Sequence, residues 1–170
     1  MNAVDMAQTV TDPTDQFDPN NYLDLYLPKR PFYFSDYAYA ACAYLDILSL
    51  SGKEIIISLK KYLESDAYGI CFGDDESVEI HIALTQFGKP ISRQDKLSTL
   101  GHELVHAKQY LLGHLQNAVD GDNEMGVWKG TRYLWTDNSD ELPWEQEAYR
   151  LEKEIYEYCT GTRSTNVSRV

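Results

Sequence analysis

The stretch SRQDKLSTLGHELVHAKQYLL, residues 92–112, decides the fold because it predicts one long amphipathic helix. Ser92 is a suitable N-cap, and Asp95 lies in the first turn. Apolar side chains recur at helical spacing, at Leu97, Leu100, Leu104, Ala107 and Leu111. We therefore expect a helix from Ser92 to Leu112 with one apolar face.

His102 and His106 lie one turn apart on this helix and so share a face. Two imidazoles placed in this way can bind one zinc ion at about 2.0–2.1 Å. Glu103 lies about 100° around the helix, where it can reach a metal-bound water without being a ligand. The pattern indicates metal-assisted peptide hydrolysis. The alternative interpretation is that both histidines are surface or half-buried side chains beside an apolar stripe.

A catalytic zinc ion needs a third protein ligand and keeps a fourth position open for water. The metzincin pattern would place glycine at 109 and histidine at 112, but this chain has Gln109 and Leu112. His114 lies two turns beyond His106, roughly 12 Å along the helix axis, which is too far to bind the same ion. We therefore expect the third ligand to be a carboxylate.

The segment LPWEQEAYRLE, residues 142–152, contains the best carboxylate candidates. Its proline and its apolar spacing predict a second amphipathic helix from about Pro143 to Cys159. Glu145 and Glu147 both lie in the first turn of this helix. Alternatively, both glutamates could only make a favourable electrostatic interaction with the positive end of the helix dipole.

Together the two helices resemble the gluzincin group of zinc peptidases, in which a Glu-x-x-Ala-type motif on a later helix supplies the third ligand. On this chain the motif falls on residues 145–148, so the resemblance implies Glu145 as the ligand and leaves Glu147 in reserve. Many relatives carry Asn or Asp directly after the alanine, whereas this chain has Tyr149. The side chain that would orient a ligating histidine is therefore missing from that position.

The chain is most similar to small phage and bacterial HExxH proteins of the ImmA/IrrE and SprT-like type, and to phage metallopeptidases with Trp-Lys-Gly and Pro-Trp-Glu segments. Those segments stand here at 128–130 and 143–145, and the likeness covers about residues 53–159. It implies a minimal zincin-like α+β domain. We expect this domain at residues 21–160, between a flexible arm at 1–20 and a flexible tail at 161–170.

A small, mostly antiparallel sheet should pack against the two helices. We expect a helix from Ser35 to Leu48 with an inner face at residues 41, 44, 45 and 48, then a strand at 54–59 and a hairpin of strands at 68–72 and 78–84. The strand at 78–84 is the expected edge strand, beside which a polypeptide substrate would add as another strand. Its alternation turns Val78, Ile80, Ile82 and Leu84 to the core. His81 then lies on the other face, either touching substrate or simply exposed.

The connection at 114–142 is long, and long loops in compact domains are usually functional or disordered. A strand-like segment at 127–135 could line the cleft. Residues 120–124 have a faint likeness to a calcium loop, but the glycine stands at the wrong place, so we expect a solvated turn.

The net charge of −12, from 27 acidic and 15 basic residues, argues against nucleic acid as a partner and against an SprT-like role on DNA. The acidic charge suits a basic peptide substrate or a basic protein partner. The N-terminal arm could also bind a protein partner. Cys42, Cys71 and Cys159 predict neither a disulfide framework nor a thiolate zinc site. We find no signal peptide and no membrane span, so we expect a cytoplasmic protein, in the host cytoplasm if it is phage-encoded.

The expected mechanism is zinc-dependent peptide hydrolysis, with His102, His106 and Glu145 as ligands and Glu103 as general base. Candidates for the residue that stabilises the oxyanion are Tyr149, Tyr133 and His81. The alternative function is a non-catalytic phage or host-interaction protein in which zinc joins two helices, or a virion component or inhibitor that keeps the zincin fold.

Overall fold

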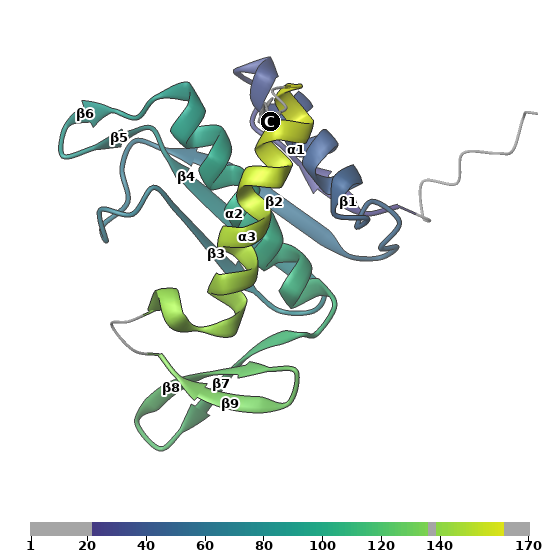
Figure 1. Ribbon diagram of the computed structural model, residues 1–170, viewed down its shortest axis with the longest axis vertical. Helices are drawn as coiled ribbons and strands as arrows, with labels where there is room; N and C mark the ends of the chain where they lie inside the picture. The colour runs from purple at the N-terminus through teal and green to yellow at the C-terminus, as the bar shows by residue number, and fades with distance from the viewer. Residues whose placement is uncertain (1–21, 136–138, 162–170) are drawn as a thin grey trace, which may run out of the picture.

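The structure is a computed structural model that describes residues 22–135 and 139–161 (Figure 1). The expected arm at 1–20 lies outside the described residues, and so does the expected tail apart from Gly161. In chain order the elements are β1 (Asp24–Tyr26), α1 (Phe32–Tyr44), β2 (Glu54–Lys60), β3 (Gly69–Gly73), β4 (Ser77–Ala83), β5 (Thr85–Gln86), β6 (Lys89–Pro90), α2 (Arg93–Leu111), β7 (Leu115–Asp120), β8 (Asn123–Trp128), β9 (Thr131–Leu134), η2 (Ser139–Glu141) and α3 (Pro143–Thr160). The predicted α+β class is confirmed. In the described part of the chain, no helix is both long enough and apolar enough to cross a membrane.

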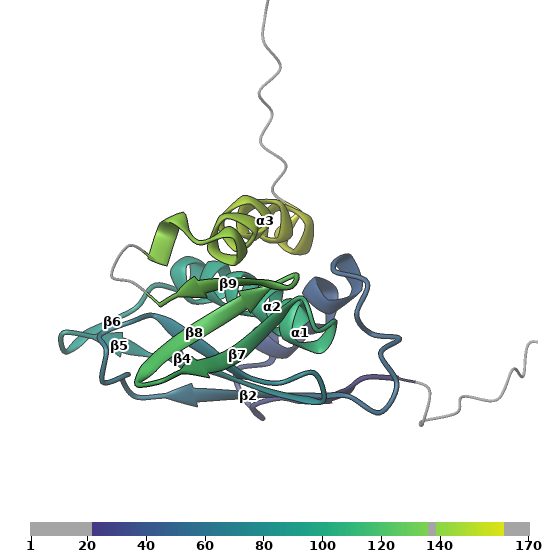
Figure 2. The same cartoon turned by 90° about the horizontal axis from the view of Figure 1, so that it is seen from below.

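A four-stranded sheet in the order β1-β2-β4-β3 forms the base of the domain. Strands β1, β2 and β4 run parallel, and β3 runs antiparallel to β4. Helices α1, α2 and α3 all lie on one face of this sheet (Figure 2). The predicted alternation in β4 is confirmed at Val78, Ile80 and Ile82, which are fully buried. His81 points to the opposite face, where its ring lies 5.1 Å from that of Phe72.

Two predictions about this sheet are wrong. Two of its three strand pairings are parallel, so the main sheet is not mostly antiparallel. The edge strands are β1 and β3 and not residues 78–84, because β4 is paired on both sides. Apolar alternation specifies which face of a strand is buried, but it does not specify which strand ends the sheet.

Helix α2 lies between the sheet and α3 and begins and ends close to the predicted residues. The backbone N–H of Asp95 donates to the Ser92 side chain at 3.0 Å, so Ser92 is the N-cap that the sequence indicated. At the other end, Lys53 Nζ donates to the Leu111 carbonyl at 2.6 Å, which satisfies one of the free carbonyls of the last turn.

Helix α3 packs directly on α2 and confirms the second predicted helix. Pro143 occupies its first turn, and Gly161 ends it in the left-handed conformation at φ 70°. Its buried side chains are Trp144, Ala148 and Ile155. A Cβ atom at Gly101 of α2 would lie 2.9 Å from the Tyr37 hydroxyl of α1 and 3.4 Å from the side chain of Ile155, so glycine chiefly leaves room for Tyr37.

Helix α1 differs from the prediction of a helix from Ser35 to Leu48. It begins three residues earlier, after Pro31, and ends at Tyr44. Asp46 adopts a left-handed conformation with φ 57°, which stops the helix before the apolar residues that follow. Of the predicted inner face, Ala41 and Leu45 are buried, whereas Tyr44 is exposed and donates to Glu154 at 2.8 Å.

The connection between α2 and α3 folds into an antiparallel sheet in the order β7-β8-β9, which lies at one end of the domain (Figure 1). The strand-like segment at 127–135 is divided by a turn at Lys129 and Gly130 into the end of β8 and all of β9. The predicted turn at 120–124 is confirmed, with Gly121 and Asp122 between β7 and β8.

Candidate metal centre

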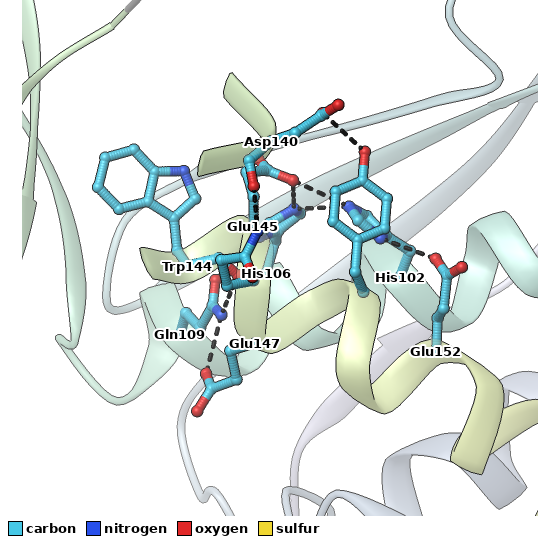
Figure 3. A network of polar contacts seen from close by, with 10 residues as sticks. His102, His106, Gln109, Asp140, Trp144, Glu145, Glu147 and Glu152 are labelled. Carbon is cyan, nitrogen blue, oxygen red and sulfur yellow. Dashed lines mark hydrogen bonds and ion pairs between the residues drawn. The ribbon is translucent and has the colours of Figure 1, made fainter. Parts of the chain in front are cut away.

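The side chains of the three predicted ligands meet at the interface between α2 and α3 (Figure 3). His102 Nε2 lies 3.1 Å from His106 Nε2 and 3.2 Å from Glu145 Oε2. His106 Nε2 lies 3.4 Å from the same carboxylate oxygen. The structure thus brings together a His/His/Glu group that could hold a metal ion.

These separations fit the geometry of a zinc site. Ligand atoms about 2.0–2.2 Å from a tetrahedral zinc ion would lie about 3.3–3.6 Å from one another. Two imidazole nitrogens and a carboxylate oxygen are also a donor set that zinc and related divalent ions accept. The residues present therefore fit the group that the sequence predicted.

Glu152 orients His102. The Nδ1 atom of His102 lies 2.9 Å from Glu152 Oε2, and because a carboxylate only accepts, Nδ1 carries the proton. Nε2 is then the nitrogen that faces the cluster. Tyr149, which stands where the gluzincin-type motif would place Asn or Asp, lies with its ring 4.8 Å from that of His102 between centroids. The orienting carboxylate is therefore present in this chain, one turn further along α3.

Gln109 orients His106 from within the same helix. Its Nε2 donates to the carbonyl of Trp144 at 3.0 Å and to Glu147 Oε2 at 2.9 Å, and both of these groups only accept. The amide oxygen must then face His106, whose Nδ1–H donates to it at 2.8 Å. Glu147, the reserve candidate for the third ligand, thus contacts Gln109 and does not belong to the His/His/Glu group.

The electrostatics of the cluster pair a cation with an anion. Burial disfavours a charged His102, but hydrogen bonds to Glu145 and Glu152 outweigh it and raise the pKa of His102 to about 9. Burial likewise opposes a charge on Glu145, but its hydrogen bond with His102 and the proximity of both imidazoles lower its pKa to about 2. A metal ion that binds here at neutral pH must displace the proton from His102.

Glu103 lies beside the cluster and is only 7% exposed. Burial raises the pKa of its carboxyl group above the usual value, although the two histidines partly oppose this. Strand β3 passes directly against it, since a Cβ atom at Gly69 would lie only 2.8 Å from Glu103 Oε1. Glycine at position 69 therefore lets the edge strand and the Glu103 carboxylate share this space.

A cleft of about 850 Å³ is lined by the three candidate ligands and by Glu103 and Glu152. Its walls are the edge strand β3, helices α2 and α3, and the end of the β7-β8-β9 sheet. Of the three oxyanion candidates, Tyr149 lines the cleft and donates to Asp140 at 3.0 Å. Tyr133 packs instead against Trp144 at 5.7 Å between ring centroids, and His81 lies on the far face of the sheet.

His114 and the three cysteines, which the sequence also singled out, lie outside the His/His/Glu group. His114 lies with its ring 6.2 Å from that of Trp128. The three cysteines are free thiols, as expected, and Cys71 lines the cleft.

Neither Glu152 nor the role of Gln109 beside His106 was predicted from the sequence. Glu145, Tyr149 and Glu152 stand at spacings of four and three, which places them on one face of α3. Gln109 follows His106 by three residues, so it lies on the same face of α2. Helical spacing could therefore have indicated both residues.

Comparisons with known proteins do not assign this chain to a family. A scan against protein-family models finds no match, and searches of curated proteins and of solved structures find no significant match. The functional interpretation therefore depends on the motifs and on the geometry of the site.

Proposed function

We propose that this chain is a zinc-dependent metallopeptidase in which His102, His106 and Glu145 hold the ion. The observation that carries the proposal is the arrangement of the two histidines, which both present Nε2 to Glu145 while Glu152 and Gln109 hold their Nδ1 atoms. Ligating histidines in metalloenzymes are commonly oriented in this way. Three protein ligands also leave a coordination position open, as catalytic zinc requires.

When bound, zinc would lower the pKa of water to about 7 and polarise the peptide carbonyl. Glu103 is the general base in this proposal. Its buried carboxyl group has a raised pKa, so it accepts a proton from water more readily than an exposed glutamate does. The same carboxyl group then returns the proton to the leaving amine.

Strand β3 supplies a place for the substrate. It is one of the two edge strands of the main sheet, and residues 68–72 line the cleft directly beside Glu103. A polypeptide that adds to this edge as a further strand is held by main-chain hydrogen bonds. Such binding would lay a peptide bond across the His/His/Glu group.

The test combines zinc analysis with a cleavage assay on a peptide library. Glu103→Gln should retain one equivalent of zinc and lose cleavage by about 10²–10⁴-fold, the usual contribution of a general base. Glu76→Gln, which changes an exposed carboxylate in the turn between β3 and β4, is the matched control and should retain both properties.

Two results would contradict the proposal. Full cleavage by Glu103→Gln would exclude Glu103 as the base. If the wild-type protein binds zinc but cleaves no peptide of the library, the alternative of a non-catalytic, zinc-joined interaction protein would be supported instead.

A further inference from the structure

The cleft contains more carboxylate groups than a metal site requires. Of the described residues that line it, none is Lys or Arg, and five carry carboxylates: Asp95, Glu103, Glu124, Glu145 and Glu152. Three of the five belong to the metal centre, and Asp95 accepts a hydrogen bond from Ser92 Oγ at 2.7 Å. Glu124 is the remaining carboxylate, and its side chain pairs with no residue in the described ranges.

Glu124 stands at the end of the cleft formed by the β7-β8-β9 sheet. Together with Asn117 and Trp135, it lines both the main cleft and an adjoining cavity of about 350 Å³. The ring of Trp135 lies 5.0 Å from that of Trp144, the residue that directly precedes Glu145. An aromatic wall with a carboxylate at its end is therefore adjacent to the metal centre.

Trp144 gives independent evidence that a ligand binds in this part of the cleft. Its side chain lines the cleft, but its indole N–H is buried and has no hydrogen-bond partner among the described residues. Figure 3 shows the nitrogen-bearing edge of the ring toward the side of the His/His/Glu group. Buried donors are normally paired, so a carbonyl group of a bound peptide would complete this one.

We propose that Glu124, Asn117, Trp135 and Trp144 form a subsite that selects a lysine or arginine side chain next to the cleaved peptide bond. The inference rests on the proposed peptidase function and names its substrate class. The aliphatic stem of the side chain packs beside Trp135, and its cationic end lies over the Trp135 ring in a cation–π contact and pairs with the carboxylate of Glu124. The other carboxylates of the cleft disfavour an acidic peptide.

The test uses the zinc-loaded full chain and labelled, end-blocked decapeptides that differ at one position near the cleaved bond. That position carries lysine, norleucine or glutamate, so lysine and norleucine have similar stems and differ in charge. A cation–π contact and an exposed ion pair together predict a kcat/KM about tenfold higher for lysine than for norleucine at one flanking position.

The variant Glu124→Gln should reduce this lysine-to-norleucine ratio to about threefold, because the cation–π contact alone remains. Asp122→Asn removes the same charge from the turn of the same hairpin, outside the cleft lining, and should leave the ratio unchanged. Equal rates for lysine and norleucine at every position within three residues of the cleaved bond would overturn the subsite. So would an unchanged ratio in Glu124→Gln.

Binding of the same peptides, measured by fluorescence anisotropy, separates this inference from the proposed function. If no peptide is cleaved, the peptidase proposal fails. Tighter binding of the lysine peptide than of the norleucine peptide, lost in Glu124→Gln, would still support the subsite. Equal binding of the two peptides would overturn it.

Discussion

Helices α2 and α3 both carry the candidate metal centre, but they are buried to very different extents. Helix α2 buries eleven of its 19 residues and contacts the main sheet, α1 and α3. Helix α3 buries three of its 18 residues and lies on the outside of the domain (Figure 2). The core therefore fixes His102, Glu103 and His106, whereas Glu145 and Glu152 depend on one docked face of a surface helix.

Polar contacts with α2 help to hold the less buried helix α3 in place. His102 on α2 contacts Glu145 and Glu152 on α3, and Gln109 on α2 contacts Trp144 and Glu147 on α3. The candidate metal centre is thus also part of the α2–α3 interface. Changes on α3 should alter metal binding while the core around α2 stays folded.

The largest effect is expected from Glu145→Ala. This change removes a ligand atom, so zinc affinity should fall by more than the roughly 10–100-fold that loss of an orienting partner costs. The measurement is a competition titration against a chelator of known affinity. Because Glu145 is not part of the apolar core, the variant should still unfold cooperatively.

Glu157→Ala is the control for this change, since Glu157 lies on the same helix and pairs with Lys153 at 4.0 Å, away from the metal centre. It should leave zinc affinity unchanged. Wild-type affinity in Glu145→Ala would mean that the third ligand lies elsewhere.

The second effect concerns Glu152, which orients His102 from α3. Glu152→Ala should weaken zinc binding by about 10–100-fold, because the imidazole ring loses the acceptor that fixes its orientation. Glu152→Gln keeps an acceptor oxygen and should recover most of the loss. Equal losses in the two variants would show that orientation by hydrogen bonding is not the role of Glu152.

The pH dependence tests the same residue. The pKa of His102 is raised to about 9 in part by Glu152, so below pH 9 a proton competes with zinc for Nε2, and the affinity rises as the pH rises. Without Glu152 the pKa falls and the proton competes less. The difference in affinity between wild type and Glu152→Ala should therefore widen from pH 6 to pH 9, and a constant difference would contradict this role.

The same contrast between the helices explains how much of the site the sequence predicted. His102, Glu103 and His106 lie within one turn and a half of one capped helix, so local spacing alone placed them. Glu145 lies 43 residues from His102, and it was placed only by a resemblance to another motif. Glu152 was missed, because its contact with His102 depends on how α3 docks on α2.

The fold, like the site, was predicted from the sequence only where the signal is local. Residues that form β2, β3 and β4 were recognised from their apolar alternation, which reports burial of a face. The order and direction of the strands depend on pairing between distant segments, so the parallel pairing of β2 with β4 and the edge position of β3 were not predicted. The role of Gly69 could not be predicted from the sequence either, because it depends on a contact with Glu103 from another element.

The smallest effect is expected from Glu147→Ala, and it decides the register of α3. Glu147 reaches the metal centre only through Gln109, which contacts His106. In the variant, the Gln109 amide keeps its hydrogen bond to the Trp144 carbonyl, so the amide oxygen still faces His106. Since a hydrogen bond contributes about 0.5–1.5 kcal/mol and only part of it reaches His106, zinc affinity should fall by about threefold. A chelator titration run beside Glu145→Ala gives the comparison. A larger loss in Glu147→Ala than in Glu145→Ala would make Glu147 the ligand and would require α3 to turn so that Glu145 leaves the cluster.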